Sequence, residues 1–179
     1  MGGETRRLFF ALWPDGVTRE ALARYEKQLG RRSGGRPVTS ANLHLTLAFL
    51  GSVEAECQAC LESMAGQIEA PPFELLLDQA GFWRRPRVLW LGARETPEPL
   101  RELVRQLNLG LAGCGLTPEN RPFQAHITLR RKALRHPEAT EFTPLYWPVR
   151  EFVLVESQTR PEGACYQVVG RWPLAVAGG

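Results

Sequence analysis

The five residues Leu-His-Leu-Thr-Leu at positions 43–47 return in the second half of the chain as Ala-His-Ile-Thr-Leu at positions 125–129. Side chains alternate between the two faces of a β-strand. In each copy the histidine and the threonine therefore share one face, and the apolar face of the first copy would hold Leu45, Leu47 and Phe49. We expect two strands whose apolar faces pack against helices and whose polar faces look at each other across a cleft.

Two imidazoles and two hydroxyls in one cleft are suited to opening a phosphodiester. Imidazole titrates near a pH of about 6.5, so a neutral ring can accept a proton from water while a charged ring donates one to the leaving oxygen. The hydroxyls can donate hydrogen bonds to the non-bridging phosphate oxygens. His44 and His126 are therefore the candidate acid and base, and Thr46 and Thr128 are the candidate phosphate-binding residues.

Two other interpretations of the repeated motif stay open. Each histidine could be an ordinary strand residue and each threonine a good β-former, although two copies with matching apolar neighbours argue against this. A metal site with two histidine ligands is the other alternative, but carboxylates at ligand spacing are missing beside both motifs. We therefore expect neither a metal nor a cofactor.

Length and composition are those of an ordinary soluble globular protein. The chain has 179 residues, of which 44% are hydrophobic and 23% charged, which suits one domain or one pair of tightly packed lobes. Its net charge of +3 permits a phosphate-bearing ligand without requiring one. No apolar run approaches the roughly 20 residues that cross a bilayer, and the apolar segment 8–13 is too short for a signal peptide. We expect a cytoplasmic protein with no membrane partner.

Four cysteines stand at positions 57, 60, 114 and 165. In a chain without an export signal we expect reduced thiols rather than a disulfide framework. Cys57 and Cys60 form a C-x-x-C pattern inside a helical periodicity, and no second pair completes a zinc site. The expected role of this pair is the packing of small side chains.

Helical and strand periodicities are intermixed along the chain, which predicts an α+β fold. The strands expected at 73–80 and 87–92, with a bend between them, should form an antiparallel hairpin. Gly51 and Ser52 should end the strand that carries the first motif. The remaining expected elements are helices at about 16–29, 54–68 and 100–113, and strands at 8–12, 43–50, 125–130, 152–158 and 165–172.

The doubled H-x-T-L motif and its context resemble the two-histidine phosphoesterase superfamily, and within it the bacterial RNA 2′,3′-cyclic phosphodiesterases of the 2′-5′ RNA ligase family. The likeness covers nearly the whole chain. Besides the second motif it rests on Arg-Leu-Phe-Phe-Ala at 7–11, Asn-Leu-His-Leu-Thr-Leu-Ala-Phe-Leu-Gly at 42–51, Asn-Arg-Pro-Phe at 120–123, and Tyr166 with Arg171 and Trp172 near the end.

The resemblance implies a single bilobal domain over residues 1–179, with two antiparallel sheets flanking a central groove and helices on the outside. It implies hydrolysis of RNA 2′,3′-cyclic phosphate ends to 2′-phosphates without a metal. His44 would protonate the leaving 3′ oxygen, His126 would activate the water, and Thr46 and Thr128 would hold the phosphate. The partner would be an RNA or oligonucleotide with a cyclic phosphate end, and we expect a monomer.

The second motif of the family continues as H-x-T-L-x-R, and its arginine falls on Arg131. Strict strand alternation would instead place Arg130 beside His126 and Thr128. We follow the motif spacing, because alternation fails where a strand bulges or ends. Arg131 would then add a fixed positive charge to the phosphate site. Its alternative role is that of a solvated member of the basic run 130–132.

Aromatic and basic residues outside the motifs are weaker candidates for RNA contacts. Phe10 and Tyr166 are predicted to bind substrate by offering a stacking surface to a base, together with Phe9 and Phe123. Core packing is the competing role for each of them. The arginines at 84, 85 and 87, near the predicted bend, could contact the RNA backbone.

Two alternative functions use the same residues. The first is the reverse reaction, joining RNA ends through a 2′-5′ linkage with the same two histidines. The second is a non-catalytic module that binds cyclic or 2′-phosphate RNA ends without turnover. Hydrolysis is favoured because water is in vast excess and the sequence carries no nucleotide-activating lysine motif.

Overall fold

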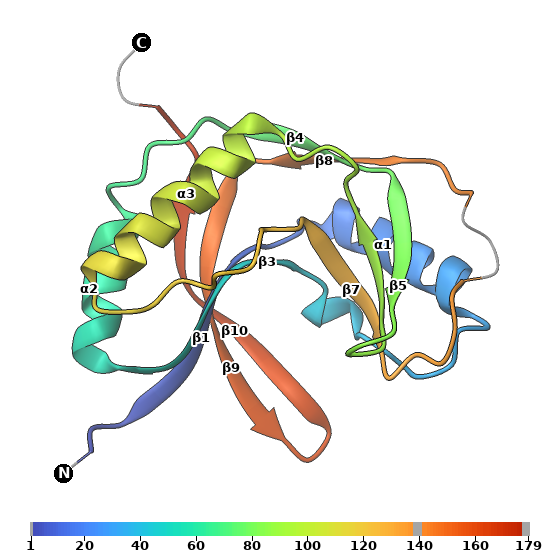
Figure 1. Cartoon of the computed structure of the whole chain (residues 1–179), viewed down its shortest axis with the longest axis horizontal. Helices are drawn as coiled ribbons and strands as arrows, with labels where there is room; N and C mark the ends of the chain where they lie inside the picture. The colour runs from blue at the N-terminus through green and yellow to red at the C-terminus, as the bar shows by residue number, and fades with distance from the viewer. Residues whose placement is uncertain (1, 138–140, 177–179) are drawn as a thin grey trace.

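The computed structural model describes residues 2–137 and 141–176, in which helices and strands are intermixed (Figure 1). The predicted α+β class is confirmed. None of the helices in this part of the chain is long and apolar enough to cross a membrane. The elements are β1 (Thr5–Leu12), α1 (Gly16–Gly30), β2 (Arg36–Pro37), a short 3-10 helix (Ser40–Asn42), β3 (Leu45–Glu54), α2 (Ala55–Ala65), β4 (Phe73–Leu77), β5 (Gln79–Trp83), β6 (Val88–Gly92), α3 (Glu98–Gly113), β7 (His126–Arg131), β8 (Leu145–Val149), β9 (Glu151–Arg160) and β10 (Gly163–Pro173).

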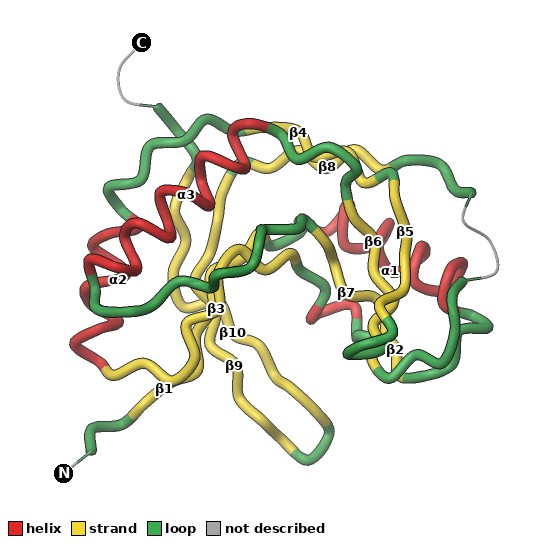
Figure 2. Tube along the Cα trace, in the orientation of Figure 1, coloured by secondary structure: helices red, strands yellow, loops and turns green. Residues whose placement is uncertain are grey.

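Within the described residues, one antiparallel sheet carries both halves of the molecule, in the strand order β10-β9-β1-β3-β7-β6-β5, with β2 beside β7. The two motif strands, β3 and β7, are the central neighbours and pair at a single position, Leu45 with Ile127. Figure 2 shows the two halves diverging from this point, with α2 and α3 beside one half and α1 beside the other. The separate strand pair β4-β8 lies across the top of both halves.

The alternation predicted for the two motifs is present in both strands. Leu45, Leu47, Ile127 and Leu129 are buried in the apolar core, while the histidines and threonines between them are only partly buried. The exception is Phe49, which is 59% exposed although its parity assigned it to the core. Residues 47 and 50 have no partner in β1, so the pairing slips twice and the face of Phe49 changes.

The strand β3 also continues to Glu54, so the prediction that Gly51 and Ser52 end it is wrong. Gly51 takes a positive φ of 70° beside the second slip in pairing, where a residue without Cβ is least strained. The strand therefore bends at Gly51 rather than stopping there. The start of α1 follows the expectation from its sequence, because Asp15 caps it by accepting a hydrogen bond from the backbone N–H of Thr18 at 2.8 Å.

The predicted hairpin is only half right. Its second strand, β6, pairs with β5, but the first part of the expected strand, β4, pairs with β8 instead. Asp78 separates the two pieces: its backbone N–H donates to Gly92 and its carboxylate accepts from the N–H of Arg94, which turns the chain between β4 and β5. The strand β8 was not predicted, because its partner lies about seventy residues earlier in the sequence.

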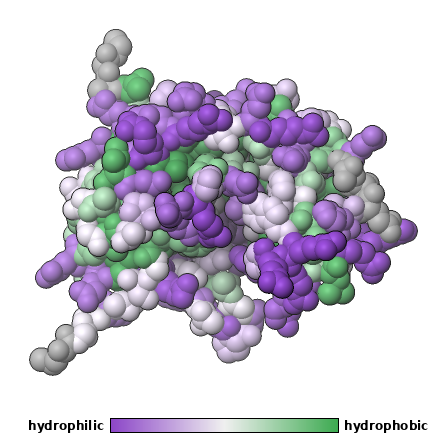
Figure 3. Space-filling view, in the orientation of Figure 1, coloured by the Kyte–Doolittle hydropathy of each residue, from purple (hydrophilic) through white to green (hydrophobic). Residues whose placement is uncertain are grey.

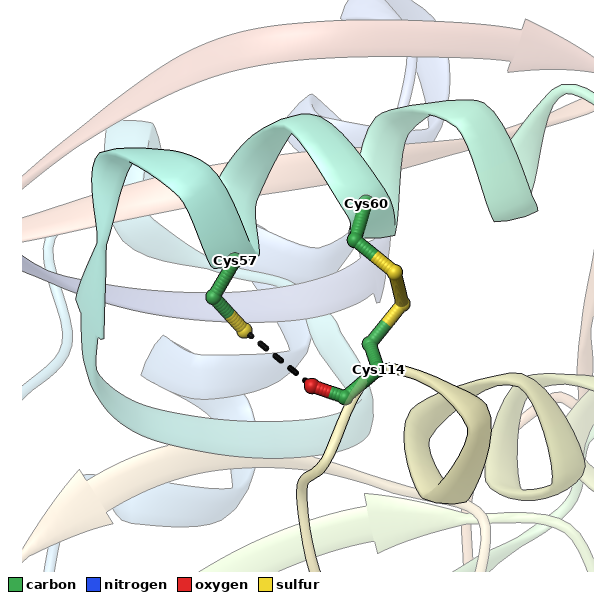
Figure 4. Close-up of a disulfide and its surroundings, with 3 residues drawn as sticks. All are labelled: Cys57, Cys60 and Cys114. Atoms are coloured by element: carbon green, nitrogen blue, oxygen red, sulfur yellow. Dashed lines mark hydrogen bonds between the residues drawn. A yellow bond between two sulfur atoms is a disulfide. The ribbon is translucent and has the colours of Figure 1, made fainter.

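The prediction of four reduced cysteines is wrong for one pair. Cys60 in α2 and Cys114, which follows α3, form a disulfide with their Cα atoms 5.9 Å apart (Figure 4). The helices α2 and α3 pack together, and this packing brings the two thiols within bonding range. Cys57 and Cys165 are free, and the Cys57 thiol lies 3.7 Å from the carbonyl oxygen of Cys114.

Candidate active site

A cavity of about 430 Å³ lies where β3 and β7 meet, and it is lined by both H-x-T motifs. His44 and Thr46 form one part of its wall, and His126, Thr128 and Arg131 form another. The structure therefore brings together all five residues that the repeated motif and its continuation singled out. They come from segments far apart in the chain, held side by side by the central pairing of the sheet.

Both histidine rings are oriented by a hydrogen bond from Nδ1 to the backbone carbonyl two residues earlier. The Nδ1 atom of His44 lies 2.7 Å from the carbonyl oxygen of Asn42, and Nδ1 of His126 lies 2.8 Å from that of Gln124. A carbonyl oxygen only accepts hydrogen bonds, so each Nδ1 carries the proton and each Nε2 is the nitrogen that exchanges protons. Nε2 of His44 lies 3.0 Å from the hydroxyl of Thr46, which can donate to a neutral ring or accept from a charged one.

Burial lowers the pKa of both imidazoles and so favours their neutral forms in the free protein. Desolvation is the main cause that lowers the pKa of His44 to about 4, and the positive charges of Arg131 and Arg19 and the ring of His126 lower it further. The hydrogen bond to Asn42 acts in the opposite direction. The pKa of His126 is also lowered, again by burial first and then by the charge of Arg131.

Aromatic rings enclose the first histidine more fully than the second. His44 is stacked on Trp13, with centroids 5.7 Å apart, and also contacts Phe9 at 4.9 Å and Tyr166 at 5.2 Å. His126 meets the ring of Trp83 edge-on at 4.6 Å. Neither tryptophan was predicted to lie at the site, because neither belongs to the repeated motif and only the fold brings them to the histidines.

The two neighbouring arginines of β7 point to different places. Arg131 lines the cavity, whereas Arg130 forms a buried ion pair with Glu26 of α1, with its Nε atom 2.5 Å from the carboxylate oxygen. The pairing of β6 with β7 skips Leu129, so the strand bulges between Thr128 and the arginines. This is the break in alternation that the motif spacing required.

One of the aromatic residues expected to bind substrate lies in the core instead of the cavity. Phe10 is fully buried in the core, where it packs against Phe152 and Trp172, so its predicted contact with substrate is wrong. Its neighbour Phe9 faces the cavity instead. Tyr166 lines the cavity as well, as does Phe123 from the loop before β7.

Basic residues from two loops complete the rim. Arg85 in the turn between β5 and β6 lines the cavity, and Figure 3 shows hydrophilic side chains gathered over this turn. Arg84 and Arg87 are exposed neighbours in the same turn and do not line the cavity. Arg121 lines it from the loop that follows α3; this residue belongs to the segment 120–123 that carried the family resemblance, but no contact with substrate was predicted for it. Nowhere in residues 2–137 and 141–176 do three or more His, Cys, Asp or Glu side chains form a group that could hold a metal ion.

Comparisons with known proteins agree with this geometry. A model of the LigT-like phosphoesterase family matches residues 12–90 and again residues 91–166, so each match contains one H-x-T motif. The RNA 2′,3′-cyclic phosphodiesterase of Escherichia coli K12 is 42% identical over 175 residues, which cover 96% of this chain and 98% of the relative.

Solved structures give the same result. The crystal structure of E. coli LigT in the apo form has a TM-score of 0.85 at 41% identity, covering 97% of this chain and 99% of that one. The same enzyme complexed with 3′-AMP has a TM-score of 0.84 at 41% identity, covering 96% and 99%. The family predicted from the doubled motif is thus confirmed: the chain belongs to the LigT-like phosphoesterases.

Proposed function

We propose that residues 1–179 act as a single domain that hydrolyses RNA 2′,3′-cyclic phosphate ends to 2′-phosphates, without a metal. The carrying observation is the pair of imidazoles that share one cavity, each held by the carbonyl two residues before it so that Nε2 is free to exchange protons. The named activity of the E. coli relative, and the binding of 3′-AMP by E. coli LigT, support the choice of substrate.

In the proposed reaction, water attacks the phosphorus atom and the bond between phosphorus and the 3′ oxygen breaks. His126 accepts the proton of the water at Nε2, and His44 donates a proton from Nε2 to the leaving 3′ oxygen. Thr46 and Thr128 donate hydrogen bonds to the non-bridging oxygens, and the positive charge of Arg131 stabilises the negative charge there. The phosphate stays on the 2′ oxygen.

The acid role of His44 requires that the ring be charged when substrate is bound. With a pKa of about 4 only about one ring in a thousand carries a proton at pH 7 in the free protein. A phosphodiester anion in the cavity adds a negative charge near the ring, which opposes the effects of burial and of Arg131. His44 therefore takes up its proton together with the substrate. The Thr46 hydroxyl then turns from Nε2 to a non-bridging phosphate oxygen, which leaves the Nε2 proton for the leaving 3′ oxygen.

The remaining lining residues suit the nucleotide that carries the phosphate. Tyr166 offers its ring to a base, and the buried ring of Phe9 packs against it with the two centroids 5.2 Å apart. Arg85 and its neighbours Arg84 and Arg87 would contact the phosphates of the preceding nucleotides, which makes binding of longer RNA depend on salt concentration.

The test is phosphorus NMR of a 2′,3′-cyclic nucleotide incubated with the protein and excess EDTA, and then of a short cyclic-ended oligomer. Wild type is expected to give the 2′-phosphate, and His44→Ala and His126→Ala are expected to give none. His136→Ala, at an exposed histidine outside the cavity, is the matched control and should retain the rate.

Three outcomes would contradict the proposal. Loss of turnover on adding EDTA would point to metal-dependent chemistry. Joining of RNA ends without hydrolysis would favour the ligase function. Binding of a cyclic-ended oligomer with no product at all would favour a module that recognises RNA ends without catalysis.

A further inference from the structure

Arg19 lies in the first turn of α1, outside both motifs, yet its guanidinium contacts three segments around His44. Nη1 donates to the carbonyl of Ser40 at 2.5 Å and to that of Leu43 at 3.0 Å, and Nη2 donates to the carbonyl of Pro14 at 3.2 Å. Leu43 directly precedes His44. One side chain therefore joins the start of α1, the end of β1 and the segment that leads into the first motif.

The same guanidinium also contacts the ring on which His44 is stacked. Its Cζ atom lies 5.1 Å from the centroid of Trp13, and Trp13 lies parallel to the imidazole of His44, with 22° between the two planes. The indole of Trp13 therefore contacts both the guanidinium of Arg19 and the imidazole of His44. A lateral shift of the tryptophan would move the wall against which His44 rests.

Arg19 has no carboxylate partner to explain its place. Within the described part of the chain no acidic group forms an ion pair with it, and its half-buried side chain has a pKa lowered by desolvation. Three carbonyl acceptors and an aromatic face satisfy the planar fork of an arginine, which a lysine ammonium could not do in the same way.

We propose that Arg19 is a positioning residue for His44: it fixes the backbone before the histidine through Leu43 and the plane of its ring through Trp13. The 3-10 helix Ser40–Asn42, which Arg19 holds at Ser40, also supplies the Asn42 carbonyl that orients Nδ1 of His44. Misplacement of a reacting group by about 1 Å can cost about 100-fold in rate, so loss of this contact should lower kcat more than it changes KM.

The test compares Arg19→Lys, which keeps the charge but not the fork, with Arg19→Met, which removes both. Arg24→Met, an exposed arginine later in the same helix, is the matched control. On a 2′,3′-cyclic mononucleotide we expect kcat to fall about 10- to 100-fold in both Arg19 variants and KM to change less than about threefold. The control should behave as wild type.

Nitrogen-detected NMR titration of the imidazoles gives a second measurement that needs no turnover. The charge of Arg19 lowers the pKa of His44, so this pKa should rise in Arg19→Met and rise less in Arg19→Lys. The other groups that face His44, namely Arg131 and His126 from β7 and Tyr166 from β10, are the same in all variants.

A merely structural role for Arg19 would lower the unfolding temperature but leave kcat of the folded variants unchanged, and that result overturns the inference. Wild-type kcat in folded Arg19→Lys also overturns it. The kinetic arm rests on the proposed function. If wild type hydrolyses no cyclic phosphate, that function fails. The ring-current shift of the carbon-bound protons of His44 by Trp13 then decides the role of Arg19: it should change in both Arg19 variants, and wild-type values in both overturn the inference.

Discussion

The neutral state of His44 should make the protein measurably less stable in mild acid. The folded-state pKa of this ring is about 4, below the ordinary value of 6.5, so the unfolded chain binds a proton that the folded protein does not. The stabilising contribution is therefore fully present above pH 6.5 and is lost as the pH falls from 6.5 towards 4. His44→Gln removes the titrating group and with it this part of the pH dependence.

The size of the effect follows from the two pKa values. The difference of about 2.5 units corresponds to at most about 3.4 kcal/mol, since each unit is worth about 1.36 kcal/mol. At pH 5 the unfolded ring is almost fully charged and the folded ring is mostly neutral, so about 2 kcal/mol of the free energy of unfolding is lost relative to pH 7.5.

Urea unfolding followed by tryptophan fluorescence at pH 7.5, 6 and 5 measures this free energy. Between the first and last pH, wild type should lose about 2 kcal/mol more than His44→Gln. His126 titrates in both proteins, so its contribution cancels in the comparison. Equal losses in wild type and His44→Gln would refute the reasoning, because they would mean that burial in the cavity does not oppose protonation of this ring.

Three further predictions concern the disulfide, the buried ion pair and the phosphate site. Replacing both Cys60 and Cys114 by Ala should lower the free energy of unfolding by about 2–4 kcal/mol, because the bond closes a loop across 54 positions of sequence. Glu26→Gln should cost about 2 kcal/mol in urea unfolding, since it leaves the largely buried charge of Arg130 with neutral acceptors such as the carbonyl of Gly34 in place of a carboxylate. Arg131→Met should lower kcat/KM for a cyclic nucleotide about 100-fold and raise the pKa of His44 in an NMR titration.

Each of these has a matched control in the chain. Cys165→Ala changes a free thiol and should leave stability near wild type. Glu102→Gln breaks an exposed ion pair with Arg105 and should have little effect on unfolding. Lys132→Met removes an exposed charge next to Arg131 and should retain kcat/KM for the mononucleotide. An effect in a control as large as in its variant would contradict the corresponding prediction.

Local periodicity was sufficient for the centre of the site. The spacing of His and Thr in each motif settled which side chains share a face, because successive residues of a strand point to opposite sides whatever the rest of the fold does. The start of α1 was equally local, since Asp15 satisfies a backbone N–H only three residues away. The α+β class followed from the mixture of periods along the chain.

Local periodicity does not predict the face of a side chain correctly where the pairing of neighbouring strands determines that face. The run Leu8–Leu12 is buried throughout, so its sequence could not tell that Phe9 faces the cavity and Phe10 the core. Phe49 changed face because β3 slips against β1, and Arg131 rather than Arg130 reached the cavity because β7 bulges against β6. Only the motif spacing of the family signalled the second of these.

The chemistry of the two motif strands, their buried faces and their family could all be predicted from the order of the residues. The groups that surround this chemistry depend on the folded chain: the rings on His44, the contacts of Arg19, the pairing of β4 with β8 and the disulfide between α2 and the end of α3. The physical reason is the distance in sequence between the residues that interact. A residue's face depends on its immediate neighbours in the chain, whereas its partners depend on segments that folding brings together from far away in sequence.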